Sequence, residues 1–182
     1  MFIDAKIETE RLILRPYIQE DAEAIFSMAT EPEHFKYQPD TPPRSMEDID
    51  RLIKWSQECN KQNTPNKIEK FNLAIILKKT EEFVGVAGLG PHDILREETE
   101  LYYALAKKFQ GKGIAKEAAK AVFEYGINVI GLDRIIATVH PDNIGSIKVI
   151  EALPMKLVKV LDGLAGEDEG YNGYNLYEYV AE

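Results

Sequence analysis

The order of hydrophobic patterns along the chain predicts an α/β protein of the α+β type, in which all 182 residues (1–182) form a single domain. Short apolar runs typical of strands are interspersed with amphipathic stretches typical of helices. Three of the strand-like runs follow one another through short connections, which favours an antiparallel meander within a mixed sheet. The length fits about one domain of ~150 residues, and no linker, repeat or low-complexity segment divides it.

The N-terminal part is expected to contain a strand followed by a helix. Residues 7–15 alternate apolar and polar side chains, which predicts a strand that Pro16 ends. Residues 20–29 carry apolar side chains at a spacing of three to four, which predicts a short helix.

A proline-rich loop and a capped helix follow. Residues 30–44 contain four prolines and predict a loop long enough to cover a substrate. Ser45 and Asp48 have the spacing of a capping box, so Ser45 is expected to be the N-cap of a helix that runs to about Cys59. Trp55 is assigned to the apolar stripe of this helix and therefore to the core.

The remaining chain predicts one long helix among strands. From Gly113 to Ile130 apolar residues recur every three or four positions, and Gly131 is placed to be the C-cap. The expected strands are residues 71–77, 83–90, 99–106, 134–139, 155–161 and 174–180, with a short helix at 144–151 and a mobile acidic loop at 162–170.

Composition and charge exclude several classes of protein. Lys and Arg number 22 against 31 Asp and Glu, giving a net charge of −9 without any basic run, which argues against nucleic-acid binding and is compatible with a cationic partner. Cys59 is the only cysteine, which excludes an internal disulfide and suits a reducing compartment. Without a signal peptide or a membrane-length apolar run, a cytoplasmic protein is expected. His34, His92 and His140 lack metal-ligand spacing, so no metal site is expected.

The junction between the strand at 99–106 and the long helix carries the clearest chemical signal. Its turn contains Gly111 and Gly113, and the first N–H groups of a helix have no intrahelical acceptor. These N–H groups and the helix dipole can bind a phosphate that approaches the backbone at glycine. The same glycines could equally make a tight turn and nothing more.

Three phosphate-binding motifs can be compared with this turn. The P-loop pattern GxxxxGK[ST] is absent. A dinucleotide fingerprint would have a small residue where Lys116 stands, and its ribose-binding acid would close a strand, whereas Asp133 precedes one. Gln110, Gly113 and Ala115 match the pyrophosphate loop [Q/R]-x-x-G-x-[G/A] of coenzyme A acetyltransferases.

The chain resembles the GNAT superfamily of acetyl-CoA-dependent N-acetyltransferases nearly end to end, and most of all its branch of ribosomal-protein N-terminal acetyltransferases. The resemblance is carried, in order, by ETERLILRPYIQEDAEAIF, FVGVAGL, ETELYYALAKKFQGKGIAKEAAKAV and LDRIIATVHPDNIGSIKVIEAL. It implies a mostly antiparallel sheet, splayed where the pantetheine arm enters, with helices on both faces. It also implies acetyl-CoA as cosubstrate and a primary amine as acceptor, either a protein N-terminus or a small cationic amine.

The resemblance also implies individual site residues. Leu105 and its neighbours would pair with the pantetheine arm, and Asn143 would contact the coenzyme. The pyrophosphate would be held by Gln110, Gly111, Lys112, Gly113, Ile114 and Ala115.

A catalytic mechanism follows from this resemblance and from the chemistry of amines. An alkylamine is mostly protonated at pH 7, and Glu100 is expected to act as the general base that removes its proton, with His92 as an alternative. A backbone N–H on the strand of Leu105 would stabilise the oxyanion. Ser146 would donate a hydrogen bond to the leaving thiolate, because Ile150 stands where many relatives have a tyrosine.

Other interpretations of the same residues remain open from sequence. Glu100 could be a solvated carboxylate beside Glu97 and Glu98, Asn143 a helix N-cap and Ser146 a first-turn residue. Tyrosines 171, 174, 177 and 179 are expected to be strand packing.

The turn at Pro154 departs from the family pattern, which has a glycine there. Proline cannot adopt φ > 0, so the path into the next strand should differ. That strand is expected close to the acceptor side, which puts an inherited acceptor specificity in question.

Two further classes of function compete with catalysis. A non-catalytic acyl-CoA sensor or interaction module is the first alternative, and a nucleotide-binding oxidoreductase is the second. The oligomeric state, monomer or homodimer, is left open by the sequence.

Overall fold

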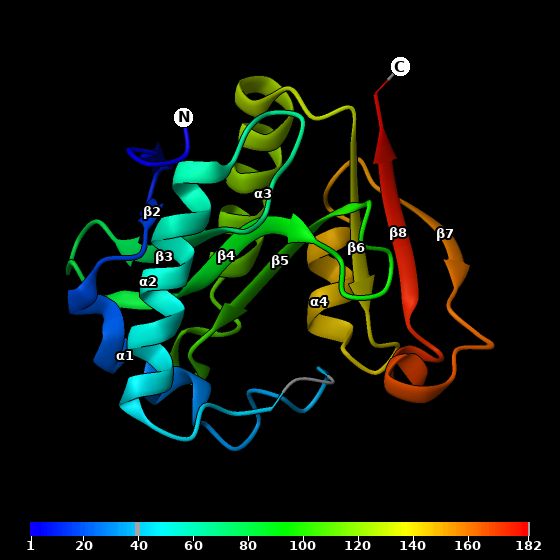
Figure 1. The fold of residues 1–182 in the computed structure, drawn as a ribbon, viewed down its shortest axis with the longest axis horizontal. Helices are drawn as coiled ribbons and strands as arrows, with labels where there is room; N and C mark the ends of the chain where they lie inside the picture. The colour runs from blue at the N-terminus through cyan, green and yellow to red at the C-terminus, as the bar shows by residue number, and fades with distance from the viewer. Residues whose placement is uncertain (39–40, 182) are drawn as a thin grey trace.

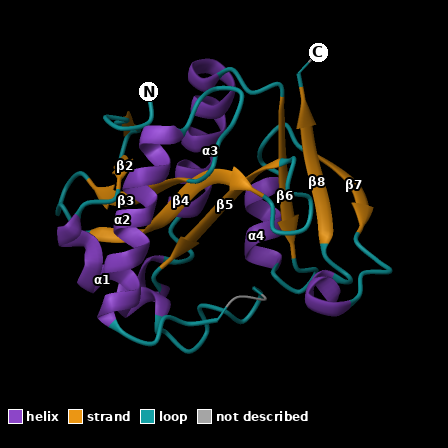
Figure 2. Ribbon diagram, in the orientation of Figure 1, coloured by secondary structure: helices purple, strands orange, loops and turns teal. Residues whose placement is uncertain are grey.

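The computed structural model describes residues 1–38 and 41–181, so Pro39 of the predicted loop lies outside the described residues. The strands form one eight-stranded sheet in the order β1-β2-β3-β4-β5-β6-β8-β7 (Figure 1). Helices α1 and α2 cover one face, and α3 and α4 lie on the other (Figure 2). The predicted mixed sheet with helices on both faces is therefore confirmed.

The first strand differs from the prediction. Residues 7–15 form two antiparallel strands, β1 (Ile7–Glu8) and β2 (Leu12–Pro16), rather than one. The hydroxyl of Thr9 accepts a hydrogen bond from the N–H of Leu12 at 2.9 Å, so a side chain stabilises the turn between the two strands. Pro16 is the last residue of β2 and pairs with Leu73 of the next strand instead of ending the ladder before it.

Helix α1 (Ala22–Ala29) and helix α2 (Met46–Gln62) confirm the two N-terminal helices, and α2 extends one turn beyond the expected end. A 3₁₀ turn at Gln19–Asp21 precedes α1. The predicted capping box of α2 is present: the hydroxyl of Ser45 accepts from the N–H of Asp48 at 3.4 Å, and the carboxylate of Asp48 accepts from the N–H of Ser45 at 3.0 Å.

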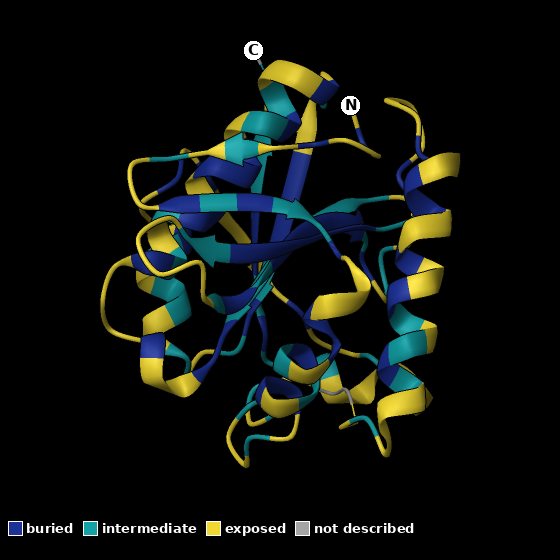
Figure 3. Cartoon of the chain, turned by 90° about the vertical axis from the view of Figure 1, so that its left-hand side faces the viewer, coloured by how far each residue is buried: buried dark blue, intermediate teal, exposed yellow. Residues whose placement is uncertain are grey.

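The assignment of Trp55 to the core is wrong. Its side chain is 50% exposed, whereas Ile49 and Ile53 of the same helix are 2% and 0% exposed. The buried stripe continues from Ile53 to Ser56, so Trp55 lies one position outside it. Figure 3 shows the same division, with largely buried strands between helices whose outer faces are exposed.

The predicted meander is confirmed. Strands β3 (Phe71–Leu77), β4 (Phe83–Pro91) and β5 (Thr99–Leu105) pair antiparallel along their lengths. Gly88 of β4 faces Tyr102 of β5, and a Cβ at this position would collide with the Tyr102 hydroxyl. Glycine is required here by the close approach of its neighbours.

The long helix is α3 (Ile114–Tyr125), which continues as a π-helical turn over Gly126–Ile130. Gly131 ends it with a φ of 84°, as expected of the predicted C-cap. Its apolar face packs against the sheet, where Ala118, Ala119 and Val122 are fully buried.

The sheet opens between β5 and β6 (Arg134–Val139). The two strands are parallel, but they share the single register pair Glu100 and Ile136 and then diverge (Figure 1). Helix α4 (Ile144–Ile150) lies beside the divergence. The expected splayed sheet is therefore present.

The C-terminal strands complete the sheet. Strand β8 (Asn175–Val180) pairs antiparallel with β6 and with the outer strand β7 (Lys156–Val160). Pro154 leads into β7, which lies at the sheet edge. The acidic loop contains a 3₁₀ helix at Gly166–Tyr171. Within the described ranges, none of the helices has the length and apolarity needed to cross a bilayer.

Candidate active site

Glu100 lies where β5 and β6 separate. Its Oε1 accepts hydrogen bonds from the backbone N–H of Thr138 at 3.1 Å and from the Thr138 hydroxyl at 2.6 Å. Both bonds use the same oxygen, so Oε2 accepts none from the residues that the structure describes. Its side chain is 17% exposed. Burial raises the pKa of Glu100, while His92 and the two bonds from Thr138 act in the opposite direction.

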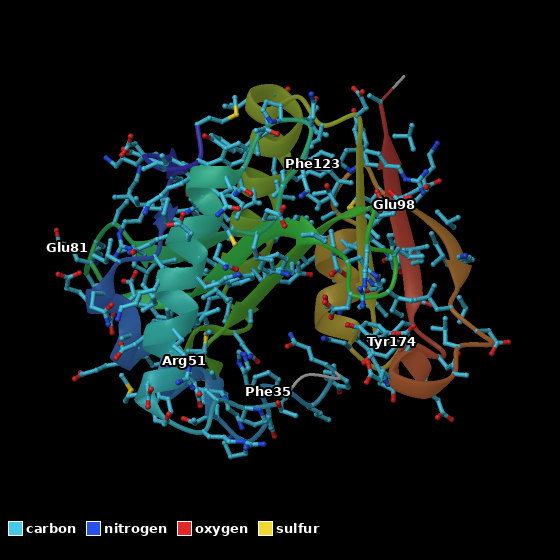
Figure 4. All side chains as sticks on the ribbon, in the orientation of Figure 1. Phe35, Arg51, Glu81, Glu98, Phe123 and Tyr174 are labelled. Atoms are coloured by element: carbon cyan, nitrogen blue, oxygen red, sulfur yellow. The ribbon has the colours of Figure 1, made fainter. Side chains whose placement is uncertain are left out.

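The neighbouring carboxylates are in different environments. Glu98 pairs with Arg134 at 3.0 Å and lies beside the C-terminal strands (Figure 4), and Glu97 is exposed. Glu100 has no such ion pair with Lys or Arg among the described residues, and burial governs its pKa. It is not a solvated carboxylate.

His92 lies behind Glu100 and is fully buried. Its Nδ1 accepts from the N–H groups of Ile94 at 3.1 Å and Leu95 at 3.0 Å, so Nε2 is the ring nitrogen that lies near Thr138. That nitrogen is 3.3 Å from the Thr138 hydroxyl and 3.8 Å from Oε1 of Glu100. His92, the alternative base expected from sequence, is thus buried beside the carboxylate of Glu100.

A buried polar network lies on the same face of β5 as Glu100. The hydroxyl of Tyr102 donates to Oδ1 of Asn72 at 2.7 Å, and Nδ2 of Asn72 donates to the Ser56 hydroxyl at 3.1 Å. The ammonium of Lys70 lies 4.4 Å from the centre of the Tyr102 ring. Burial raises the pKa of Tyr102 far above its ordinary value, so this tyrosine stays neutral. The network ties α2 to the sheet beside the candidate base.

Tyr103, which the sequence analysis did not single out, contacts Ser146. Its hydroxyl is 2.8 Å from the Ser146 hydroxyl and 3.3 Å from the Ser146 carbonyl oxygen. Burial raises the pKa of Tyr103 to about 12. The side chain of Asn143 accepts from the N–H of Ser146 at 3.1 Å, which confirms Asn143 as the N-cap of α4. Ile150 is apolar and buried, so position 150 of α4 supplies no hydroxyl group.

The backbone of β5 presents polar groups to the opening. The N–H of Ala106 donates to the carbonyl of Val84 in β4 at 3.0 Å. Because backbone groups alternate in direction along an antiparallel strand, those of Tyr103 and Leu105 point towards the divergence. The side chain of Gln110 donates to the Leu105 carbonyl at 3.1 Å and so joins the glycine turn to this strand.

The glycine turn has the conformation that only glycine adopts readily. Gly111 and Gly113 have φ values of 73° and 76°, and Gly113 is the N-cap of α3. A Cβ added at Gly111 would meet no atom within 4 Å. The first N–H groups of α3, including those of Ile114 and Ala115, have no acceptor within the helix.

Three side chains brace this turn from behind. Arg11 donates from Nη1 to the Lys112 carbonyl at 2.9 Å, and its Nε pairs with Glu117 at 2.6 Å. The hydroxyl of Thr9 donates to the same carboxylate at 2.5 Å. Burial alone would raise the pKa of Glu117, but the bonds from Thr9 and Arg11 hold it below its ordinary value. Sequence patterns could not reveal a contact between residues so far apart.

Aromatic residues join the 30–38 segment to the C-terminal half. The hydroxyl of Tyr174 donates to the carbonyl of Tyr37 at 3.1 Å, and the His140 ring lies 5.1 Å from the Tyr174 ring. The hydroxyl of Tyr171 donates to Asp93 at 2.6 Å. Figure 4 shows Phe35 on the segment that follows α1 and Tyr174 near the start of β8. Tyr171 ends the 3₁₀ helix and Tyr174 precedes β8, so neither packs within a strand as expected, and both make polar contacts instead.

Comparison with known families places the chain among the acetyltransferases. The family described as "Acetyltransferase (GNAT) domain" matches residues 11–156, and the chain belongs to this family. GNAT acetyltransferases use acetyl-CoA as the acetyl donor, so the protein is an N-acetyltransferase with acetyl-CoA as cosubstrate.

Proteins of similar sequence and similar fold support the family assignment. The uncharacterized N-acetyltransferase p20 of Bacillus licheniformis is 34% identical over 145 residues, covering 80% of this chain and 79% of that protein. The crystal structure of a GNAT-family acetyltransferase from Bacillus anthracis has a TM-score of 0.75 and 25% identity, covering 97% of this chain and 98% of that one. Mycobacterium smegmatis RimJ, in complex with CoA-disulfide, has a TM-score of 0.77 at 22% identity over 93% and 82% of the two chains.

Proposed function

We propose that the protein transfers the acetyl group of acetyl-CoA directly to a primary amine, with Glu100 as the general base. The observation that carries this proposal is the environment of Glu100 at the vertex of the opened sheet. One of its oxygens is fixed by Thr138, and the other accepts no hydrogen bond from the described residues. Because burial raises its pKa, the carboxylate is a stronger base than an exposed one.

The donor side consists of the opening and the glycine turn. The N–H groups of Gly111, Lys112, Gly113, Ile114 and Ala115 bind the pyrophosphate, and Gln110 holds the turn against β5. The pantetheine arm lies along the divergence beside the backbone of Leu105, and Asn143 lies at its far side. A Cβ added at Gly111 would meet no atom within 4 Å apart from its chain neighbours, which supports this assignment because a ligand can approach the backbone there.

The reaction then proceeds by direct attack. Oε2 of Glu100 accepts a proton from the acceptor ammonium, directly or through a water molecule, and the neutral amine attacks the thioester carbon. A backbone N–H of β5 donates to the oxyanion of the tetrahedral intermediate. The attacking nitrogen, positively charged in this intermediate, loses its second proton to solvent water. The carbon–sulfur bond breaks, its electron pair stays on sulfur, and Ser146 donates a hydrogen bond to the thiolate.

The acceptor belongs to the class of cationic amines. The net charge of −9 favours such a partner. Two proteins of similar fold act on amines of this class: a spermidine N-acetyltransferase from Vibrio cholerae, in complex with CoA and spermine, and a ribosomal-protein-S5-alanine acetyltransferase from Vibrio fischeri. A small polyamine and a protein N-terminus are therefore the two acceptors to compare.

The test measures CoA release from acetyl-CoA with spermidine, spermine and short peptides that begin with Ala or Ser. Glu100→Gln should lower kcat by about 100-fold or more, the usual contribution of a general base, with unchanged acetyl-CoA affinity. Glu97→Gln is the matched control, because this nearby carboxylate is exposed, and it should keep wild-type turnover. Equal turnover in Glu100→Gln and wild type across the pH range would remove Glu100 from the base role.

Donor binding is tested separately by calorimetry. Acetyl-CoA should bind to the wild type, NAD should not, and Gly113→Glu should abolish binding, because its carboxylate repels the pyrophosphate. Retained binding in Gly113→Glu would overturn the assignment of the glycine turn. Binding without turnover on any amine would instead favour a sensor that does not catalyse.

A further inference from the structure

We propose that Tyr103 is a positioning residue that directs the Ser146 hydroxyl towards the departing thiolate of coenzyme A. This inference rests on the proposed function and extends it to the leaving-group side of the reaction. It is carried by the 2.8 Å contact between the two hydroxyls and by the place of Tyr103 on β5.

Tyr103 and Glu100 lie on opposite faces of the same strand. Successive side chains of a strand alternate between faces, so residues three apart point in opposite directions. Glu100 reaches Thr138 of β6, whereas Tyr103 reaches Ser146 of α4. A thioester in the opening between β5 and β6 therefore has the base on one side and the hydroxyl pair on the other.

The hydroxyl pair can adopt two arrangements. The Ser146 carbonyl only accepts hydrogen bonds, and it lies 3.3 Å from the Tyr103 hydroxyl. When Tyr103 donates to this carbonyl, the Ser146 hydroxyl is free to donate to Tyr103. When Tyr103 donates to the Ser146 oxygen, the Ser146 proton is released for another acceptor.

A thiolate in the opening selects the second arrangement. As the carbon–sulfur bond breaks, its electron pair becomes a negative charge on sulfur, the carbonyl re-forms, and the acetylated amine leaves. Ser146 donates its hydrogen bond to the sulfur, and Tyr103 donates to Ser146, so two aligned dipoles oppose the new charge. The N–H of Ser146, held by Asn143 at 3.1 Å, keeps the serine in place during this step.

The proton stays on Tyr103 throughout. A thiol has an ordinary pKa of about 8.5. Burial raises the pKa of Tyr103 to about 12. Transfer of the phenolic proton to the thiolate is therefore unfavourable, and the thiolate takes its proton from water after it leaves. Tyr103 acts through Ser146 and does not itself supply the proton.

A double-mutant cycle tests this dependence. Tyr103→Phe and Ser146→Ala should each lower kcat about 10-fold, with unchanged acetyl-CoA affinity. The double variant should be no slower than Ser146→Ala, because Tyr103 has no effect once the serine hydroxyl is gone. Tyr125→Phe is the control: it removes a tyrosine hydroxyl that donates to Met1 at 2.6 Å, away from the site, and should keep wild-type kcat. Multiplicative losses in the double variant, or wild-type kcat in Tyr103→Phe, would overturn the proposal.

Fluorinated tyrosines at position 103 separate hydrogen bonding from packing. Fluorine makes the phenol more acidic and a better donor at nearly unchanged volume, so kcat should rise from Phe to Tyr to 3-fluorotyrosine. Equal kcat with tyrosine and with 3-fluorotyrosine at position 103 would indicate that Tyr103 has a purely structural role and would contradict the inference. Wild-type protein that binds acetyl-CoA but acetylates no amine would overturn the proposed function as well, whereas normal turnover with unresponsive Tyr103 variants overturns the inference alone.

Discussion

Thr138 donates both its N–H and its hydroxyl to one oxygen of Glu100, at 3.1 and 2.6 Å. The contact joins β5 to β6 at the point where their single register pair ends. It therefore closes the vertex of the opening and orients the carboxylate at the same time. Beyond this contact β5 and β6 separate, so the strands are joined and the carboxylate is oriented by the same pair of residues.

Thr138→Val should release the carboxylate while keeping the shape of the side chain. Loss of the hydroxyl removes a bond that lowers the pKa of Glu100, so this pKa rises further. Glu100 then stays protonated up to a higher pH, so the acidic limb of the kcat/KM profile should move up by about one pH unit. Thr138→Ser keeps the hydroxyl and should retain the wild-type profile. A Val variant with an unshifted limb would contradict the role of this bond.

Glu100→Gln should make the protein more stable at neutral pH. Burial raises the folded-state pKa of Glu100, so this group favours folding below its unfolded pKa, and the contribution is lost as pH rises through the folded pKa. Glutamine is neutral throughout and can accept the same bonds from Thr138. The stability difference between variant and wild type, measured by urea denaturation, should be small near pH 4 and grow towards pH 7. A difference that does not change with pH would contradict the raised pKa.

Arg11→Ala should weaken donor binding without slowing the chemical step. Arg11 holds the Lys112 carbonyl at 2.9 Å and lies outside the opening. The dissociation constant of acetyl-CoA should rise about five-fold, equivalent to about 1 kcal/mol of lost positioning, with unchanged kcat at saturation. Lys120→Ala removes an exposed cation of α3 that pairs with Glu124, and calorimetry should show wild-type affinity for this control. Equal acetyl-CoA affinities of Arg11→Ala and Lys120→Ala would show that the contact of Arg11 with the Lys112 carbonyl does not contribute to donor binding.

Gly111→Ala and Gly113→Ala should each destabilise the protein by about 1–2 kcal/mol, the usual cost of a left-handed backbone for a residue with a side chain. At Gly111 no steric clash contributes, because a Cβ would meet nothing within 4 Å. Gly145→Ala is the matched comparison, since this glycine is inside α4 without positive φ, and alanine should stabilise it by about 0.5–1 kcal/mol. Chemical denaturation curves for the three variants give the ordering. Loss of stability in Gly145→Ala equal to the others would refute the conformational explanation.

Local patterns predicted most of the helices and strands. The capping box of Ser45 and Asp48 and the C-cap at Gly131 are formed by residues close in sequence, so their spacing is visible in the chain. The prediction for residues 7–15 was wrong because Thr9 makes the turn with its hydroxyl, without the glycine or asparagine that usually marks one. Trp55 was misplaced because one step along a helix turns a side chain by about 100°.

The candidate site was predicted only in part. Glu100, Ser146 and the glycine turn were identified through a family resemblance, and their roles stay predictions. Thr138, Tyr103 and Arg11 were missed because their partners lie 38, 43 and 106 positions away along the chain. Such contacts depend on which strands become neighbours and on which face a side chain lies, and neither follows from local periodicity.

The divergence of β5 and β6 also affects how long the folded enzyme resists proteolysis. Strands β5 and β6, on either side of the opening, share one register pair. In our proposal acetyl-CoA occupies the rest of the opening, in the place that another strand would take. A bound donor at about 100 times its dissociation constant adds about 2.7 kcal/mol to the folded state. We therefore expect the lifetime of the enzyme against proteolysis to follow the supply of its own substrate, with amide hydrogen exchange slowing along β5 as the donor concentration rises.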